Sequence, residues 1–237
     1  GEHTGTVYLD KARGELAVAV LQEFLDQWLA ENGGEIRFRG QVHTPYVCDV
    51  SLEARDGGRL VFGDGADTVH YLGGSNLVTA RVNVVDSELD MVDSLVLGGK
   101  YTSGSITGDP LSYAYLYASN SVVNSGTGAD GDRRLYIVNG EVEMHDSDWT
   151  SHGLYLGYAG ASSKLTVKSG KFRQVGKTII GSEASGKAEL SFEGGESVIS
   201  NTVLSEFQFG AAAGESVIRL SGGKLTLDFP LYANYFV

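Results

Sequence analysis

A short sequence unit recurs along this chain and restricts the possible folds more than any other feature. Its plainest copy spans residues 164–186, KLTVKSGKFRQVGKTIIGSEASG. The copy contains two apolar residues at alternate positions, a Gly, a second apolar stretch, a second Gly and a turn of small residues. Repeats of this size predict stacked units rather than one globular core, because each unit buries its apolar face only against its neighbours.

Other copies align with this one by position. The first half recurs in segments with the same spacing of apolar residues and Gly, namely Leu165-x-Val167-x-x-Gly170, Leu135-x-Ile137-x-x-Gly140, Leu190-x-Phe192-x-x-Gly195 and Ile218-x-Leu220-x-x-Gly223. The second half, IIG at 179–181, recurs as LYLG at 154–157 and FQFG at 207–210. An ungapped match of 81–103 with 164–186 pairs apolar residues, which are Val82 with Leu165, Val84 with Val167, Leu89 with Phe172, Val92 with Val175, and Leu97 with Ile180. The spacing between copies is irregular, which predicts loops of variable length between strands of constant register.

The composition agrees with an all-β chain. Of 237 residues, 33 are Gly and 3 are Pro, and 42% are hydrophobic, which indicates many tight turns and a folded core. From residue 35 onward the chain reads as short strands bounded by Gly, Ser, Asn and Asp, without the long helices of a doubly wound α/β fold. An antiparallel sandwich or barrel, with hairpin turns such as Asn139-Gly140, is the alternative. The aligned repeats favour a parallel solenoid over 35–237, with roughly seven or eight coils.

Residues 1–34 are predicted to form an N-terminal cap with one helix at 12–32. Apolar residues recur there at three- and four-residue steps, namely Leu16, Val20, Leu21, Phe24, Leu25, Trp28 and Leu29. Asn32-Gly33 would end the helix. Its polar face carries Glu23, Asp26 and Glu31, so we expect it to pack on protein rather than on a membrane. Such a helix would cover the first coil and its unpaired strand edges.

The two ends and the single cysteine give further expectations. The chain begins with Gly1 rather than Met, which suggests a processed N-terminus. It ends on the apolar segment ANYFV at 233–237, so either the solenoid continues in a longer protein or another chain associates with this end. Cys48 is the only cysteine, which excludes an internal disulfide, and its neighbours indicate a buried strand residue.

The net charge of −12 narrows the classes of partner. An acidic surface repels the phosphates of nucleic acids and the headgroups of anionic membranes. No apolar run is long enough to span a bilayer, so we expect no membrane insertion. The acidity is typical of a solvated, exposed protein, and the alternative is a role in binding cations.

The segment 154–195, LYLGYAGASSKLTVKSGKFRQVGKTIIGSEASGKAELSFEGG, resembles the repeats of bacterial cell-surface β-solenoids. It is similar to the autotransporter-passenger and pectin-lyase-like group, over about residues 81–228. The resemblance implies a right-handed parallel β-helix in an extracellular or cell-surface protein. Proteins of this group are often adhesins or scaffolds and sometimes cleave polysaccharides, but no catalytic motif of the group matches this sequence.

An acidic cluster, DSELDMVD, is the first candidate site. Asp86, Glu88 and Asp90 alternate, so on a strand they would share one outward face. Three such carboxylates are candidates for binding a hard cation or for acid and base roles in glycoside cleavage. The alternative is a solvated polar face without chemistry.

The segment EVEMHDSDW is the second candidate, and we expect it in a loop that interrupts the repeat. It brings together Glu143, His145, Asp146, Asp148 and Trp149. Asp146 is a further catalytic candidate, and Trp149 with Tyr155 and Tyr158 would stack on sugar rings. The alternative is an exposed turn anchored by the Trp. No zinc motif fits the spacing of the histidines.

Two Gly-Asp segments are the third candidate. FGDGADTV at 62–69 matches the core of calcium-binding nonapeptide repeats, and SGTGADGD at 125–132 matches it less closely. Calcium ligands would come from Asp64, Asp67, Asp130 and Asp132. Such sites need consecutive repeats, whereas these two segments lie far apart in the sequence, so plain turns are the alternative and no other cofactor is expected.

The sequence contains no nucleophile elbow and no phosphate-binding loop. We therefore expect a structural or adhesive role rather than an enzyme: a rigid, acidic extracellular scaffold that presents loops or packs into a surface assembly. One alternative is a carbohydrate-active β-helix, as a lyase, hydrolase or binding module. Another is a self-assembling filament or shell subunit that associates through its C-terminal end.

Overall fold

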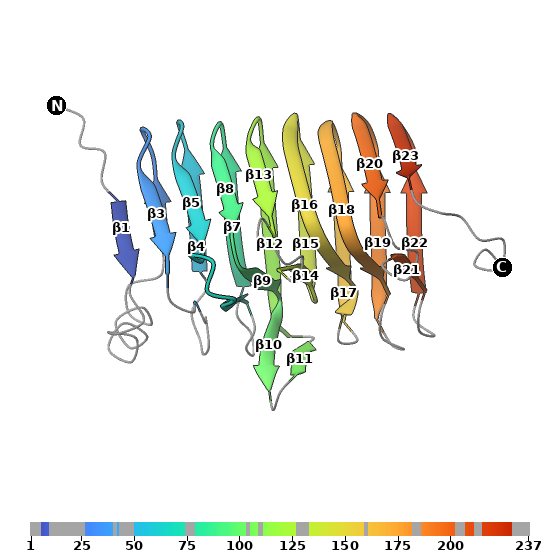
Figure 1. Ribbon diagram of the computed structural model, residues 1–237, viewed down its shortest axis with the longest axis horizontal. Coiled ribbons are helices and arrows are strands. Elements are labelled where there is room, and N and C mark those ends of the chain that lie inside the picture. Colours follow the sequence, from blue (N-terminus) through green and yellow to red (C-terminus); the bar gives the residue numbers. More distant parts are fainter. Residues whose placement is uncertain are drawn as a thin grey trace.

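The computed structural model describes residues 6–9, 27–39, 42, 50–73, 79–102, 105–108, 111–126, 133–158, 161–181, 186–201, 207–210 and 215–228. They form an elongated parallel β-solenoid whose strands lie across its long axis (Figure 1). The prediction of an all-β parallel solenoid is confirmed. Cys48 lies outside the described residues.

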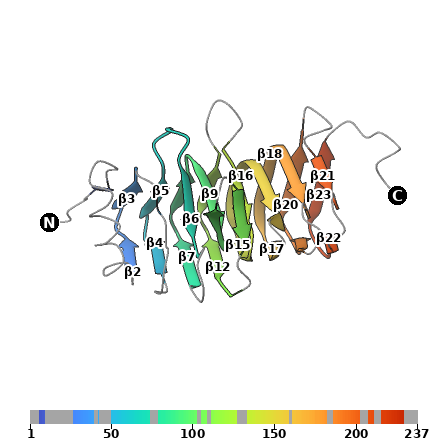
Figure 2. The ribbon, with the colours of Figure 1, turned by 90° about the horizontal axis from the view of Figure 1, so that it is seen from below.

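Two long sheets lie on opposite sides of the solenoid (Figure 2). Sheet B has eight strands, which are β2 (Gln27–Ala30), β4 (Val50–Arg55), β7 (Thr79–Val85), β12 (Tyr113–Ser119), β15 (Gly140–His145), β17 (Ser162–Val167), β19 (Lys187–Phe192) and β22 (Glu215–Leu220). Sheet A has 13 strands and is bent into two faces, A1 and A2.

The A1 face follows sheet B in each turn and the A2 face follows A1. The A1 strands are β1 (Thr6–Leu9), β3 (Glu35–Phe38), β5 (Arg59–Phe62), β8 (Glu88–Met91), β13 (Val122–Ser125), β20 (Glu196–Ser200), β23 (Lys224–Asp228) and the first parts of β16 (Ser147–Leu156) and β18 (Gly170–Ile180). The A2 strands are β6 (Val69–Leu72), β9 (Ser94–Leu97), β14 (Leu135–Ile137), β21 (Phe207–Phe209) and the second parts of β16 and β18. About six turns are complete, and partial turns extend both ends.

Apolar side chains at equivalent positions stack from turn to turn inside the solenoid. One column in sheet B includes Val82, Leu116, Val142, Leu165, Leu190 and Ile218, each paired with the next. The predicted pairs involving Val82, Val84, Leu89 and Leu97 are all confirmed as members of common columns. Val92 lies in a bend, so no strand pair tests its match.

One predicted equivalence is wrong. Leu135 and Ile137 pair with Leu154 and Leu156 on the A2 face, rather than belonging to the sheet B column of Leu165. The Leu-x-Ile-x-x-Gly spacing occurs there because the chain leaves β14 through a short bend before Gly140 begins β15. A Cβ atom at position 140 would clash with the carbonyl oxygen of Ala114 on the neighbouring turn, so this corner requires Gly.

The corner from sheet B to the A1 face repeats a tight reversal. Between β2 and β3, Asn32 and Gly33 have φ angles of 54° and 74°, and the Gly34 amide donates to the Glu31 carbonyl over 2.9 Å. Asn, Asp and Gly tolerate this left-handed conformation best. Asp86 and Asp146 occupy equivalent corners with φ angles of 52° and 45°.

The predicted helix at 12–32 is not supported. Residues 10–26 lie outside the described residues, and Gln27–Ala30 form strand β2, which pairs with β4. Trp28 packs against Phe38 with ring centroids 6.0 Å apart. Pairing with a neighbouring strand determines this segment, which helical periodicity alone does not anticipate. Asn32-Gly33 makes a turn between strands instead of ending a helix.

A hairpin of β10 (Gly99–Thr102) and β11 (Ser105–Gly108) projects from the solenoid between β9 and β12 (Figure 1). It is the one antiparallel pair within the described ranges. Ile106 of this hairpin packs on a small cluster outside the A2 face, formed by Tyr71, Val96 and Val138.

Candidate functional site

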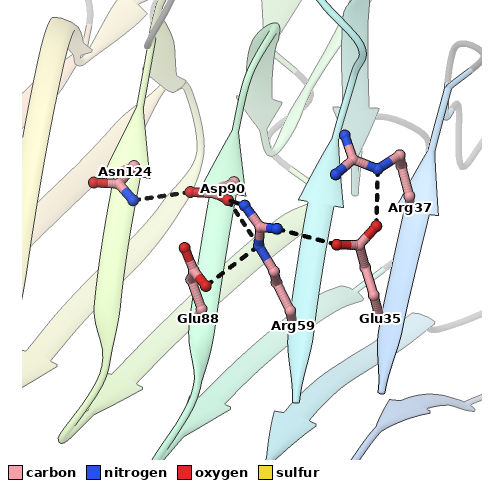
Figure 3. Close-up of polar contacts among 6 residues, drawn as sticks. All are labelled: Glu35, Arg37, Arg59, Glu88, Asp90 and Asn124. Atoms are coloured by element: carbon pink, nitrogen blue, oxygen red, sulfur yellow. Dashed lines mark hydrogen bonds and ion pairs between the residues drawn. The ribbon is translucent and has the colours of Figure 1, made fainter. Parts of the chain in front are cut away.

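Charged side chains form a ladder on the outer surface of the A1 face. Figure 3 shows Arg59 extending between its neighbours on β3 and β8. Its Nη1 donates to Glu35 Oε2 over 3.1 Å, its Nε donates to Asp90 Oδ2 over 2.9 Å, and its Nε lies 3.3 Å from Glu88 Oε2. Arg37 adds a second cation, with Nε 2.9 Å from Glu35 Oε1. We call Glu35, Arg37, Arg59, Glu88 and Asp90 the charged ladder.

Asp90 is the most enclosed member of this ladder. Its side chain is only 8% exposed, and Arg59 contacts it through both Nε and Nη2. Asn124, on the next strand β13, donates from Nδ2 to Asp90 Oδ1 over 2.8 Å (Figure 3). Arg59 on β5 and Asn124 on β13 therefore hold the Asp90 carboxylate from the strands on either side, and little of it is exposed to solvent.

The two glutamates of the ladder differ in proton affinity. Hydrogen bonding from Arg37 lowers the pKa of Glu35, with further lowering by the charge of Arg59. Burial raises the pKa of Glu88, and the negative charge of Asp90 raises it further against the opposing charge of Arg59. Burial disfavours the charged form of Arg59, but Asp90, Glu88 and Glu35 raise its pKa overall. Of the two glutamates, Glu88 therefore holds a proton more readily than Glu35.

The predicted carboxylate trio is only partly brought together. Glu88 and Asp90 share the outer face of β8, as expected, whereas Asp86 lies in the turn before this strand. Asn120 Nδ2 donates to Asp86 Oδ1 over 2.6 Å. Asp86 and Glu88 border a shallow hollow of about 410 Å³, together with Gly57, Ser87, Asn120 and Val122. The hollow therefore places the Glu88 carboxyl and the hydrogen-bonded Asp86 carboxylate beside the same space.

The segment around Asp146 is not a loop. Glu143 and His145 belong to β15, Asp146 makes the corner, and Asp148 and Trp149 belong to β16. His145 Nε2 lies 2.5 Å from Glu143 Oε1. Asp146 is exposed, and its amide donates to Ser169 Oγ over 2.9 Å. This sequence therefore continues the repeat instead of interrupting it.

Trp149 lies in the interior and not at the surface. Its side chain is 1% exposed, stacks edge-on with Phe172 at 6.2 Å, and directs Nε1 toward Ser125 Oγ at 3.5 Å. Strand alternation places position 149 inward, because it belongs to the column of Leu89 and Phe172. Its ring therefore has no surface to offer a sugar, contrary to our expectation.

Tyr155 and Tyr158 do lie together, on the outside of the A2 face. Their ring centroids are 5.8 Å apart, and Tyr136 packs on Tyr155 at 4.7 Å. The Arg134 guanidinium lies 5.1 Å from the centre of the Tyr155 ring. Tyr155 is buried by these neighbours, so this cluster stabilises the outer surface rather than forming an open platform.

The first Gly-Asp segment is bound by an arginine. Arg133 donates from Nε to Asp67 Oδ1 over 2.9 Å and from Nη2 to the Gly65 carbonyl over 2.6 Å. Its Nε also lies 3.4 Å from Asp93 Oδ1. Asp64 is exposed, and Asp130 and Asp132 lie outside the described residues. Across the described part of the chain, no three His, Cys, Asp or Glu side chains gather as metal ligands.

Sequence reasoning missed Arg59 and Tyr113. Alternating charge at aligned positions 35, 59 and 88 was the available signal for Arg59. Tyr113 borders a hollow of about 280 Å³ on the outside of sheet B, with charged side chains of both signs, which are Glu141, Lys164, Lys187, Glu189 and Glu215. Burial, together with the nearby charge of Glu141, raises the pKa of Tyr113 to about 12, so the phenol stays protonated.

Comparison of the chain with protein-family models, curated proteins and solved structures finds no significant match. Within the described residues, no helix has the length and apolar character needed to cross a membrane.

Proposed function

We propose that this protein is a structural or adhesive scaffold of the cell surface or extracellular space, a rigid acidic rod that presents its loops and the β10–β11 hairpin. The right-handed winding implied by the sequence resemblance belongs to the same proposal. Its support is the charged ladder, in which an arginine and an asparagine from adjacent rungs hold Asp90. Asp90, held in this way, ties neighbouring rungs together and is enclosed by them rather than presented to a ligand.

Surface labelling of intact source cells tests the location and role together. An antibody against this protein is expected to label unpermeabilised cells, and beads coated with the protein are expected to adhere to the surfaces those cells colonise. Labelling that requires lysis of the cells would overturn the proposed location. If the beads adhere no better than albumin-coated beads, the adhesive role is overturned and only the structural role remains proposed.

A carbohydrate-active β-helix is the second candidate, supported by one observation. Glu88, with its raised pKa, and Asp86, held by Asn120, border the same hollow, and glycoside cleavage uses one protonated and one ionised carboxyl. The scaffold proposal expects no new reducing ends when the protein is incubated with acidic and neutral polysaccharides. Release of sugar ends that is lost in Glu88→Gln and Asp86→Asn, but kept in the control Glu196→Gln, would favour the enzyme.

A further inference from the structure

The last described strand of each face exposes interior side chains at positions that are buried in the strands before it. Phe209, Leu220 and Leu227 are 47%, 54% and 40% exposed. Their partners on the preceding rung are Ile180, Phe192 and Ile199, and all three are buried. Within the described ranges, β22 pairs only with β19 and β23 only with β20. As far as the described residues extend, this end presents an apolar interior and two strand edges to which no further described strand is paired.

β22 and β23 carry charged side chains on their outer faces but lack other usual protections of edge strands. β22 has six residues and β23 has five, which is comparable to the strands they extend. Neither strand contains a proline or an inward-facing charge, because the inward positions are occupied by Ser216, Ile218, Leu220, Leu225 and Leu227. Natural proteins use such features to prevent strand pairing between molecules, and their absence in these two strands favours pairing.

Charge makes both edge strands complementary to themselves in the antiparallel direction. In β23, KLTLD, pairing of Thr226 with its own copy places Lys224 opposite Asp228 and Leu225 opposite Leu227. In β22, ESVIRL, pairing of Val217 with its own copy places Glu215 opposite Arg219. Opposite charges directly across a strand pair are stabilising, and like charges are destabilising.

One rotation generates both pairs. β22 is the last strand of sheet B and β23 the last of the A1 face, so they lie on opposite sides of the end, and their arrows run in opposite directions in Figure 1. A twofold axis across the end face, perpendicular to both strands, superimposes each strand on its own reversed copy while interior side chains stay interior. Such an interface uses the same patch on both molecules and closes at two copies.

The pairing also continues a pattern already present within the chain. Along the outer A1 column, Asp148, Lys171, Glu196 and Lys224 alternate in sign from rung to rung. Asp228 of a second copy would be the next member after Lys224. On sheet B, Lys187 lies 3.1 Å from Glu215, and Arg219 of a second copy would follow Glu215. We propose that the C-terminal end of the solenoid binds a second copy of this protein tail to tail, through antiparallel pairing of β22 with β22 and of β23 with β23.

Sedimentation equilibrium of the full chain tests this proposal. We expect a reversible monomer–dimer equilibrium without larger species. A protein that stays monomeric up to about 1 mM would overturn the proposal and indicate that the same chain covers this end. Open-ended polymers would also overturn it, since they require head-to-tail stacking on β1 and β2.

Charge variants distinguish this interface from any other. Lys224→Asp and Asp228→Lys each place like charges opposite each other twice in the dimer, so each should raise the dissociation constant about tenfold. An equimolar mixture of the two variants restores both attractive pairs and should form heterodimers with the affinity of the original protein. The double variant K224D/D228K should dimerise normally as well.

Controls keep this experiment decisive if a variant is less stable. Circular dichroism verifies that each variant is folded, and Arg81→Asp, on an exposed position of β7 in the middle of sheet B, should dimerise like the original protein. Heterodimer formation in the mixture supports the tail-to-tail register. Failure of the folded mixture to associate better than either variant alone would overturn it.

Discussion

Equivalent side chains have different surroundings in the last described turn of the solenoid and in the turn before it. Ile199 and Leu227 occupy one interior column, and Phe192 and Leu220 occupy another. The first member of each pair is buried and the second is exposed. Strand alternation therefore determines where a side chain points, while the following rung determines whether it is buried. Four predictions test this difference, beginning with the largest expected effect.

A charge placed in an inner column should unfold several turns together. Ile180→Asp buries a carboxylate without a partner, and we expect a loss of more than about 4 kcal/mol in the free energy of unfolding. Phe209→Asp, the matched change on the last described strand of the same column, should cost less than about 1 kcal/mol. Urea unfolding followed by circular dichroism measures both, and equal losses would refute the columns.

His70 tests whether the first complete turn is as closed as the middle ones. Burial lowers the pKa of its imidazole to about 4 against the opposing effect of Asp64, and Nδ1 accepts a hydrogen bond from the Val42 amide over 3.2 Å. Since this pKa lies below the usual 6.5, the unfolded chain takes up the proton first. The contribution of neutral His70 is complete above pH 6.5 and should be lost as the pH falls toward 4, by about 3 kcal/mol.

The measurement for His70 is a difference between two proteins. Unfolding free energies of the original protein and of His70→Gln are determined at several pH values between 4 and 7.5. The gap between them should change with pH, because only the original protein titrates at this position. A constant gap across this range would show that His70 is not enclosed.

Truncation of aliphatic side chains should reproduce the contrast on a smaller scale. Ile199→Ala removes buried methyl groups and should cost about 3 kcal/mol, while Leu227→Ala, one rung later in the same column, should cost less than about 1 kcal/mol. The measurement is made at low protein concentration, so that association at this end does not add to stability. If Leu227→Ala is as costly as Ile199→Ala, the last turn is covered.

The difference in stability between enclosed and exposed positions should be smallest for charged side chains on the outer surface. Arg59→Met removes the cation that contacts the enclosed Asp90 and should cost about 2 kcal/mol, after allowance for the partial exposure of Arg59. Lys187→Met removes an ion pair with Glu215, in which both side chains are largely exposed, and should change stability by less than about 0.5 kcal/mol. Thermal unfolding at low salt compares them, and a ranking in the reverse order would contradict the argument.

Spacing along the chain predicted the columns because the same physical constraint acts on every turn. Leu165, Val82 and Leu190 all face the interior at one height of sheet B, so each needs an apolar side chain. The spacing around Leu135 misled because two different corners of the solenoid place Gly three residues after an apolar residue. Alternation also indicated correctly that Glu88 and Asp90 share a face.

Other features depend on partners that lie far along the sequence. Arg59 joins Glu35 and Asp90, which are 24 and 31 residues away, so its role follows only from the stacking of rungs. The residues around Trp149 have a composition typical of a sugar-binding loop, yet the register of β16 places the Trp149 side chain in the interior. The strand at 27–30 likewise depends on β4, because its own periodicity is that of a helix.

The hairpin of β10 and β11 shows that this architecture accepts added residues at one corner. It is inserted where the chain passes from the A2 face to sheet B, while the same passage after β14 is accomplished by two residues, Val138 and Asn139. The strands on either side keep their parallel pairing in both cases. A rod of this kind can therefore gain or lose display elements at that corner during evolution, or by engineering, without altering the spacing along its length.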